Sequence, residues 1–255
     1  MRAPHQLLHS RTRVCPRYAL LPLEGYPASR LPEWPECEAR VLAAPALGAA
    51  FVEYLINVPR GRGTRHESDG RVETFFYLLE GDAKLGIAAK EHRLKAGGFA
   101  LVPASSDFQL EATHDTKLLV LRKAYERVAG ACMAEVSEPA PVVGNEADVK
   151  PTVYMGDEGA LLQTLIPDEL PYDMAMNIFT FTTGHSLPYV ETHVMEHGLW
   201  FMQGKGLYYL DDTWMEVEAN DFIWMGPYVP QSFYATGPVP SKYLYYKNVN
   251  REIPL

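Results

Sequence analysis

The sequence has few cysteines and no long apolar run. Its three cysteines are widely spaced and form no C-x-x-C pair, which fits reduced thiols in a cytosolic protein and argues against a disulfide framework. No apolar stretch approaches the roughly 20 residues of a membrane-spanning helix. Pro16 and Pro22 interrupt the one candidate for the core of a signal peptide. We therefore expect a cytoplasmic protein.

The sequence also has no stripe of basic residues. Asp and Glu number 32 against 23 Lys and Arg, which gives a formal net charge of −9. The one basic cluster, Arg60, Arg62 and Arg65, lies in a glycine-rich loop and is typical of a solvated hairpin tip. This balance argues against a nucleic-acid partner and against an anionic membrane surface.

The densest group of potential metal ligands lies in residues 184–204, GHSLPYVETHVMEHGLWFMQG. Glu191 and His193 are two residues apart, so on a β-strand both side chains would leave the same face. His197 follows four residues later, and Gln231 adds an amide oxygen downstream. Two imidazoles, a carboxylate and an amide suit a divalent ion such as Mn, Fe(II), Ni or Zn. The alternative is a pair of hydrogen-bonded core histidines.

Two interpretations of the metal-ligand stretch compete. Residues 193–197 fit H-x-x-E-H, a zinc-peptidase motif that requires a helix. Gly184, Pro188 and Gly198, with β-branched and aromatic residues between them, favour strands. As strands, the stretch resembles the first cupin motif, G-x5-H-x-H-x3-4-E-x6-G, with Glu191 for its first His and His197 for its Glu. The second motif, G-D-x4-P-x-G-x2-H, is matched in spacing up to Gln231.

Short, regularly punctuated strands occur twice along the chain. An offset of 123 residues takes Gly61 to Gly184, Gly81 to Gly204 and Phe108 to Gln231 without a gap. This internal duplication predicts an all-β bicupin, two tandem jelly-roll β-barrels. We expect an N-terminal arm at residues 1–50, a first barrel at 51–135, a linker at 136–150 and a second barrel at 151–255.

The same offset predicts which barrel binds metal. The ligands of the second half correspond, in order, to Ser68, Gly70, Thr74 and Phe108. None of these four is a good ligand, and Phe108 would fill the space. We therefore expect a metal-free, structural first barrel; nearby Glu73 falls outside the ligand positions.

From about Phe51 to Ile253 the chain resembles the (S)-ureidoglycine aminohydrolase family of bicupins. The likeness is carried by FVEYL, VETFFYLLEG, YVETHVMEHGLWFMQGKGLYYLDDTW, the Gln231 segment and YLYYKNVNREI. It is weak or absent before about Arg40. The resemblance implies Mn(II) as the cofactor, held by Glu191, His193, His197 and Gln231. It also implies a small anionic ureide substrate contacted by Tyr208, Tyr243 and Lys247.

The last strand supports this assignment independently of the resemblance. Tyr243, Tyr245 and Lys247 alternate, so all three should face one side. A lysine buried among aromatic rings needs an anion, and the substrate carboxylate would supply one. The alternatives are that Tyr208 and Tyr243 are core aromatics with satisfied hydroxyls and that Lys247 is a solvated edge residue. For release of ammonia from ureidoglycine, we expect Glu191, Lys247 and Tyr208 to be catalytic, with Glu191 moving a proton.

Two other functions remain open from the sequence. One is another metal-dependent cupin enzyme, a dioxygenase or an isomerase acting on a small organic acid. The other is a non-catalytic bicupin that binds a small molecule. In each case the open sheet edges and apolar outer faces of the barrels predict a homo-oligomer, a dimer or larger.

Overall fold

The structure is a computed structural model that describes residues 11–128 and 136–251. Within these ranges it has no α-helix, only three short 3-10 turns: η2 (Leu23–Gly25), η3 (Pro45–Leu47) and η5 (Glu146–Asp148). The predicted all-β class is confirmed. The first ten residues of the predicted arm and the last seven of the predicted first barrel lie outside the described residues. No described helix is long and apolar enough to cross a membrane.

The first barrel packs a larger sheet on a smaller one. Its described strands are β3 (Glu38–Ala43), β4 (Phe51–Val58), β5 (Gly63–His66), β6 (Val72–Glu80), β7 (Asp82–Ile87), β8 (Lys90–Lys95), β9 (Gly98–Val102), β10 (Phe108–Ala112), β11 (Thr116–Ala124) and β12 (Val142–Asn145). The larger sheet has the order β12-β9-β6-β11-β4-β3, and the smaller one has the order β5-β10-β7-β8.

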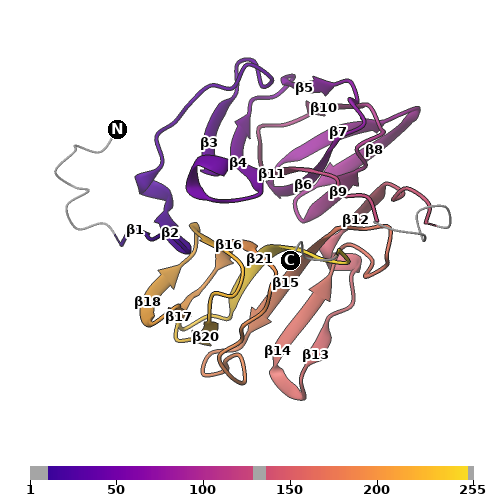
Figure 1. The fold of residues 1–255 in the computed structure, drawn as a ribbon. Helices are drawn as coiled ribbons and strands as arrows, with labels where there is room; N and C mark the ends of the chain where they lie inside the picture. The colour runs from indigo at the N-terminus through magenta and orange to yellow at the C-terminus, as the bar shows by residue number, and fades with distance from the viewer. Residues whose placement is uncertain (1–10, 129–135, 252–255) are drawn as a thin grey trace.

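The second barrel repeats this plan, and Figure 1 shows it stacked against the first. Its described strands are β13 (Thr152–Tyr154), β14 (Asp157–Thr164), β15 (Met174–Phe181), β16 (His197–Gln203), β17 (Lys205–Leu210), β18 (Thr213–Glu218), β19 (Asp221–Met225), β20 (Gln231–Ala235) and β21 (Ser241–Asn248). The larger sheet runs β19-β16-β21-β15-β14-β13, and β18-β17-β20 form the smaller one.

The strand pairing itself is duplicated. Phe108 pairs with Ile87 in the first barrel, and Gln231 pairs with Leu210 in the second, so both partners shift by the same 123 residues. The pairing β6–β9 recurs in the same way as β16–β19. The sequence repeat is therefore a repeat of hydrogen-bond register.

Two segments tie the N-terminal arm and the linker to the barrels. Strands β1 (Arg13–Val14) and β2 (Tyr18–Pro22) add to the second barrel's larger sheet, where β2 pairs with β19. Arg11 reinforces this contact because its Nη2 donates a hydrogen bond of 2.9 Å to Oδ1 of the buried Asp221. Within the expected linker, β12 pairs with β9 of the first barrel.

Alternating side chains build three apolar cores. Inward residues of each barrel fill that barrel, for example Phe76 and Leu85 in the first and Phe201 and Phe233 in the second. The opposite faces of the two larger sheets pack against each other, and Trp200 lies in this third core. The stacked barrels leave the mouth of the second one open to solvent, where a cavity forms.

Candidate functional site

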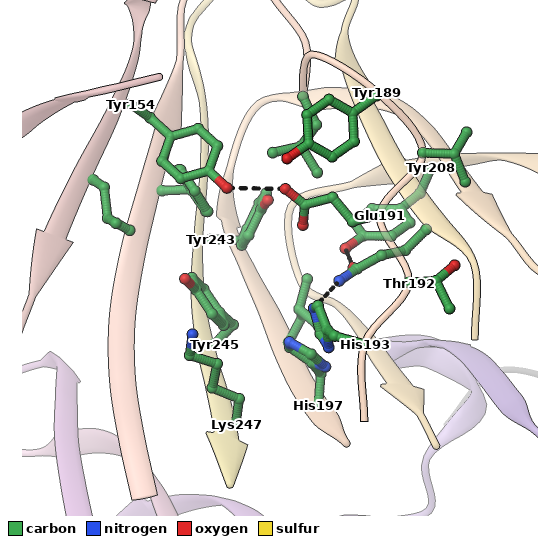
Figure 2. Close-up of a pocket in the computed structure, with 16 residues that line it drawn as sticks. Tyr154, Tyr189, Glu191, Thr192, His193, His197, Tyr208, Tyr243, Tyr245 and Lys247 are labelled. Atoms are coloured by element: carbon green, nitrogen blue, oxygen red, sulfur yellow. Dashed lines mark hydrogen bonds between the residues drawn. The ribbon is translucent and has the colours of Figure 1, made fainter. Parts of the chain in front are cut away.

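A cavity of about 600 Å³ lies in the second barrel and gathers every candidate site residue. Figure 2 shows how the side chains from the loop before β16 and from strands β16, β17 and β21 converge, and Gln231 joins them from the start of β20. The cavity lining includes all seven: Glu191, His193, His197, Tyr208, Gln231, Tyr243 and Lys247.

The backbone around the candidate ligands differs from both predicted conformations. Residues 188–196 form no helix, which removes the peptidase interpretation, and only an isolated bridge stands where a strand was expected. Glu191 and Gln231 exchange both backbone hydrogen bonds, N–H to O distances of 2.7 and 2.8 Å. The carbonyl of His193 accepts from Tyr228 N–H at 2.8 Å. These contacts hold the irregular loop against the start of β20.

The two histidines are neutral, adjacent rings. Their centroids are 4.6 Å apart. Burial lowers the pKa of His193, and burial followed by His193 lowers the pKa of His197 well below its usual value. Each Nδ1 is buried and has no hydrogen-bond partner among the described residues. Neutral imidazoles with unsatisfied nitrogens are what a bound cation requires.

Two tyrosine hydroxyls hold the two oxygen-bearing candidates. Tyr154 donates to Oε1 of Glu191 at 2.9 Å, and Tyr208 donates to Oε1 of Gln231 at 2.7 Å. Nε2 of Gln231 lies 3.2 Å from Nε2 of His193. Burial raises the pKa of both tyrosines, with Glu191 contributing next, so both hydroxyls stay protonated donors.

Sequence reasoning missed Tyr154. It lies at the end of β13, on the edge of the larger sheet, just before a tight turn in which Met155 and Gly156 have φ of +48° and +84°. Its ring packs edge-on against Phe179, with centroids 4.8 Å apart. Nothing in the local sequence separates this tyrosine from an ordinary strand-end aromatic, because its partner is 37 residues away.

The last strand presents one polar and aromatic face to the cavity. Tyr243, Tyr245 and Lys247 all line it, as their alternation predicts. Tyr245 accepts a hydrogen bond from Asn177 at 3.2 Å and stacks near His197. Lys247 is half-buried and makes no ion pair with any described acidic residue. A partly buried ammonium without an ion pair favours an anionic partner.

The candidate metal site rests on the chemistry of its donor atoms and not on a preformed cage among the described residues. Among the described residues, no three His, Cys, Asp or Glu side chains cluster closely enough to hold a metal ion. The candidate set relies on the amide of Gln231 as its fourth member, and Oε1 of Glu191 is directed to Tyr154 (Figure 2). A mixed N/O set of this kind suits borderline-hard divalent ions.

The corresponding place in the first barrel is filled. Phe108 is buried and contacts Phe76 and His66, with ring centroids 5.2 and 5.3 Å away. The strand pairing corrects one predicted match between the two halves. Phe108 pairs with His66, and its counterpart Gln231 bridges to Glu191. The first-barrel counterpart of Glu191 is therefore His66, whereas the sequence offset had predicted Ser68. One imidazole beside a phenyl ring provides no ligand set.

Glu73 points away from the first barrel's interior. It is buried, 3.6 Å from Lys123, which also pairs with Asp173 of the second barrel. Burial, followed by Asp173, raises the pKa of Glu73. This residue therefore belongs to the contact between barrels and contributes nothing to a metal site inside the first one.

The fold and the site together define a two-barrel cupin with its polar cavity in the second barrel. Oxalate decarboxylase of Bacillus subtilis shares this fold, with a TM-score of 0.69 at 11% identity over 92% of this chain and 78% of that one. The crystal structure of the Escherichia coli protein YlbA matches more closely, with a TM-score of 0.84 at 30% identity and full coverage of both chains.

The sequence comparison gives the family. The chain is 33% identical over 242 residues to (S)-ureidoglycine aminohydrolase of E. coli K12, covering 93% of this chain and 90% of that protein. No family model matches the chain. The chain belongs to the (S)-ureidoglycine aminohydrolase family.

Proposed function

We propose that this protein hydrolyses (S)-ureidoglycine to (S)-ureidoglycolate and ammonia, a step of allantoin and purine breakdown. One observation carries the proposal: a relative that bears this activity in its name aligns over 93% of the chain. The cavity of about 600 Å³ in the second barrel, which gathers the imidazoles, Glu191 and Lys247, supports it. The substrate class is a small ureide with one carboxylate.

The reaction exchanges one bond at one carbon. The C–N bond to the amine breaks, a C–O bond to water forms, and the proton lost by water leaves with the amine as ammonia. Lys247 supplies a fixed positive charge for the substrate carboxylate, and Tyr243 lines the same cavity from the same face of β21, on the far side of Tyr245. Holding the carboxylate fixes the reacting carbon relative to Glu191.

Glu191 is the group placed to move the proton. It is a half-buried carboxylate on the cavity wall with one oxygen occupied by Tyr154. Its second oxygen, when released from a metal ion, can accept a proton from water and pass it to the departing amine. Tyr208, hydrogen-bonded to Gln231, orients that amide and closes the side of the cavity opposite Tyr154.

The donor types of the four candidate ligands suit a divalent metal ion, and Mn²⁺ is the proposed cofactor, with Fe, Ni or Zn as other candidates. Glu191, His193, His197 and Gln231 would hold it. When bound, such an ion is a Lewis acid that orients substrate heteroatoms and stabilises developing negative charge.

An ammonia-release assay tests the activity. Freshly made (S)-ureidoglycine is incubated with metal-free protein, with and without added Mn²⁺, and ammonia is measured against a no-protein blank. Mn²⁺-dependent release that exceeds the blank is expected. Oxygen consumption with a small organic acid would favour a dioxygenase, and binding of ureidoglycine without ammonia release would favour a non-catalytic bicupin; either result overturns the proposal.

The proposed homo-oligomer is supported by the outer face of the second barrel's smaller sheet. Leu207, Trp214 and Tyr234 are 38%, 50% and 40% exposed on adjacent strands. Their first-barrel counterparts by register are Lys84, Glu91 and Glu111. A face that is charged in one repeat and carries three exposed large apolar side chains in the other is suited to cover by a second copy of the chain.

Sedimentation tests the assembly. The wild-type protein should sediment above its 28.6 kDa monomer mass at micromolar concentration. A variant with Leu207→Lys and Trp214→Glu, the residues of the first barrel, should shift toward the monomer. A wild-type protein that is monomeric under these conditions would contradict the proposal.

The proposed domain division remains 51–135 and 151–255 for the two barrels, with a 1–50 arm and a 136–150 linker. Residues 13–22 add strands to the second barrel, and 142–145 add one to the first. The cytoplasm is the proposed compartment, and Cys15 and Cys37 carry free thiols in the structure.

A further inference from the structure

The Glu191 side chain has two oxygens in different surroundings. Oε1 accepts the hydroxyl of Tyr154 at 2.9 Å. This is the one hydrogen bond that the Glu191 side chain makes with any described residue, although its backbone is fixed on both sides by Gln231. In Figure 2 the carboxylate lies between Tyr154 and the imidazoles, with its other oxygen on the imidazole side.

Tyr154 is itself held rigidly. It ends β13, which pairs with β14, and the register shift at Tyr154 turns the residue out of the regular ladder. Its ring packs edge-on against Phe179, which in turn stacks on Tyr245, with centroids 5.6 Å apart. A hydroxyl on a ring packed against Phe179 can orient a carboxylate at little entropic cost.

We propose that Tyr154 is a positioning residue: its hydroxyl occupies Oε1 of Glu191 and leaves Oε2 as the oxygen that serves the metal ion and the reacting substrate. The inference rests on the proposed function and extends it to Tyr154, which lies on β13, a strand that carries none of the predicted site residues. Partners that orient ligating side chains typically change metal affinity 10- to 100-fold when they are removed.

Tyr154→Phe removes the hydroxyl and keeps the ring on Phe179. Zn²⁺ is titrated into the metal-free protein, because it binds N/O sites more tightly than Mn²⁺ and stays measurable in weakened variants. We expect the Kd for Zn²⁺ to rise about tenfold. The control Tyr209→Phe removes a hydroxyl from the outward face of β17, where the ring packs on Trp214, and should change the Kd less than about twofold.

A second background separates orientation from packing. In a Glu191→Ala protein, Tyr154→Phe should cause no further change in Kd, because the carboxylate that the hydroxyl orients is gone. An equal rise in both backgrounds would show that Tyr154 acts through packing, and no rise in the wild-type background would show that it does not act on Glu191. Either result overturns the proposal.

The kinetic effect is a separate measurement. At saturating Mn²⁺, Tyr154→Phe should lower kcat about tenfold and change KM less than about threefold, because the substrate carboxylate rests on Lys247 and not on Glu191. If the wild-type protein releases no ammonia, the proposed function fails, and the Zn²⁺ titrations still decide whether Tyr154 positions Glu191. Unchanged kcat in an active protein would overturn the catalytic part of the proposal.

Discussion

The two barrels share a backbone plan but differ in what fills it. At one position of the repeated register the first barrel has Phe108 and the second has Gln231; at another the first has Thr74 and the second His197. Phe108 packs on Phe76 and His66, whereas Gln231 opens onto a cavity of about 600 Å³. Strand pairing therefore creates the position in both barrels, and side-chain identity decides whether it is packed or available to a ligand.

Each barrel also has a basic residue paired with the Thr74 or His197 position. Thr74 pairs with Arg122, and His197 pairs with Lys247, so the two basic residues occupy equivalent places. Both are half-buried and lack an ion pair with a described residue. What distinguishes Lys247 is its surroundings: an open aromatic cavity with neutral imidazoles next to it.

The largest expected effect comes from removing an imidazole. Purified protein should carry about one divalent ion per chain in the second barrel, and His193→Ala or His197→Ala should lose the ion and with it the activity. Metal analysis after gel filtration measures this. Thr74→Ala and Ser68→Ala in the first barrel should keep the full metal content. Full metal content in both histidine variants would contradict the assignment of the metal site to the second barrel.

The next effect concerns the countercharge. Lys247→Met keeps much of the side-chain length and removes the charge, which should cut kcat/KM at least about tenfold, since a hydrogen bond to a charged group is worth about 1.5–3 kcal/mol. Metal content and the thermal midpoint should stay nearly unchanged. Arg122→Met, the matched change in the first barrel, should leave kcat/KM within about twofold. If both variants lowered kcat/KM equally, the result would contradict a specific role for Lys247 in binding the substrate.

The smallest effect on activity is expected at the contact between the barrels, where a buried carboxylate changes stability instead. Glu53 is buried there, with Oε2 unpartnered and close to where a side chain at Gly198 would lie, and burial raises its pKa to about 8. The folded protein then keeps a proton that the unfolded chain releases near pH 4.3. Stability should be insensitive to Glu53 below that pH and should fall as pH rises toward 8, by up to about 1.4 kcal/mol per pH unit.

Glu53→Gln removes this titration. Urea unfolding of the metal-free protein at pH 5, 6, 7 and 8 should show a flatter decline for the variant than for the wild type. Glu91→Gln, at an exposed position of β8, should keep the wild-type slope. Parallel slopes for the Glu53 variant and the wild type would mean that Glu53 is already ionised in the folded protein.

Much of the site could be predicted because it is encoded locally. Residue type and spacing were enough to select Glu191, His193, His197 and Gln231, and alternation along one strand was enough to place Tyr243 and Lys247 on one face. The fold class followed from strand-length apolar runs between turn glycines, repeated at one offset. These signals can be read in the sequence because each depends on residue type and spacing along the chain.

Other features depend on contacts between distant segments. The bond from Tyr154 to Glu191 joins residues 37 apart, and Lys123 of the first barrel meets Asp173 of the second. The equivalence of His66 with Glu191 appeared only in the strand pairing, since the ungapped repeat had placed Ser68 there.

The sequence by itself determined the class of fold, the repeat and the chemical set of the site, because the alternation of apolar residues and the chemistry of imidazole and carboxylate are properties of the chain. Only the tertiary structure decided which oxygen of Glu191 is occupied and where Glu73 points, toward Lys123 and away from the barrel interior. The physical reason is that packing of two large sheets face to face fixes side-chain directions that local backbone preferences leave open.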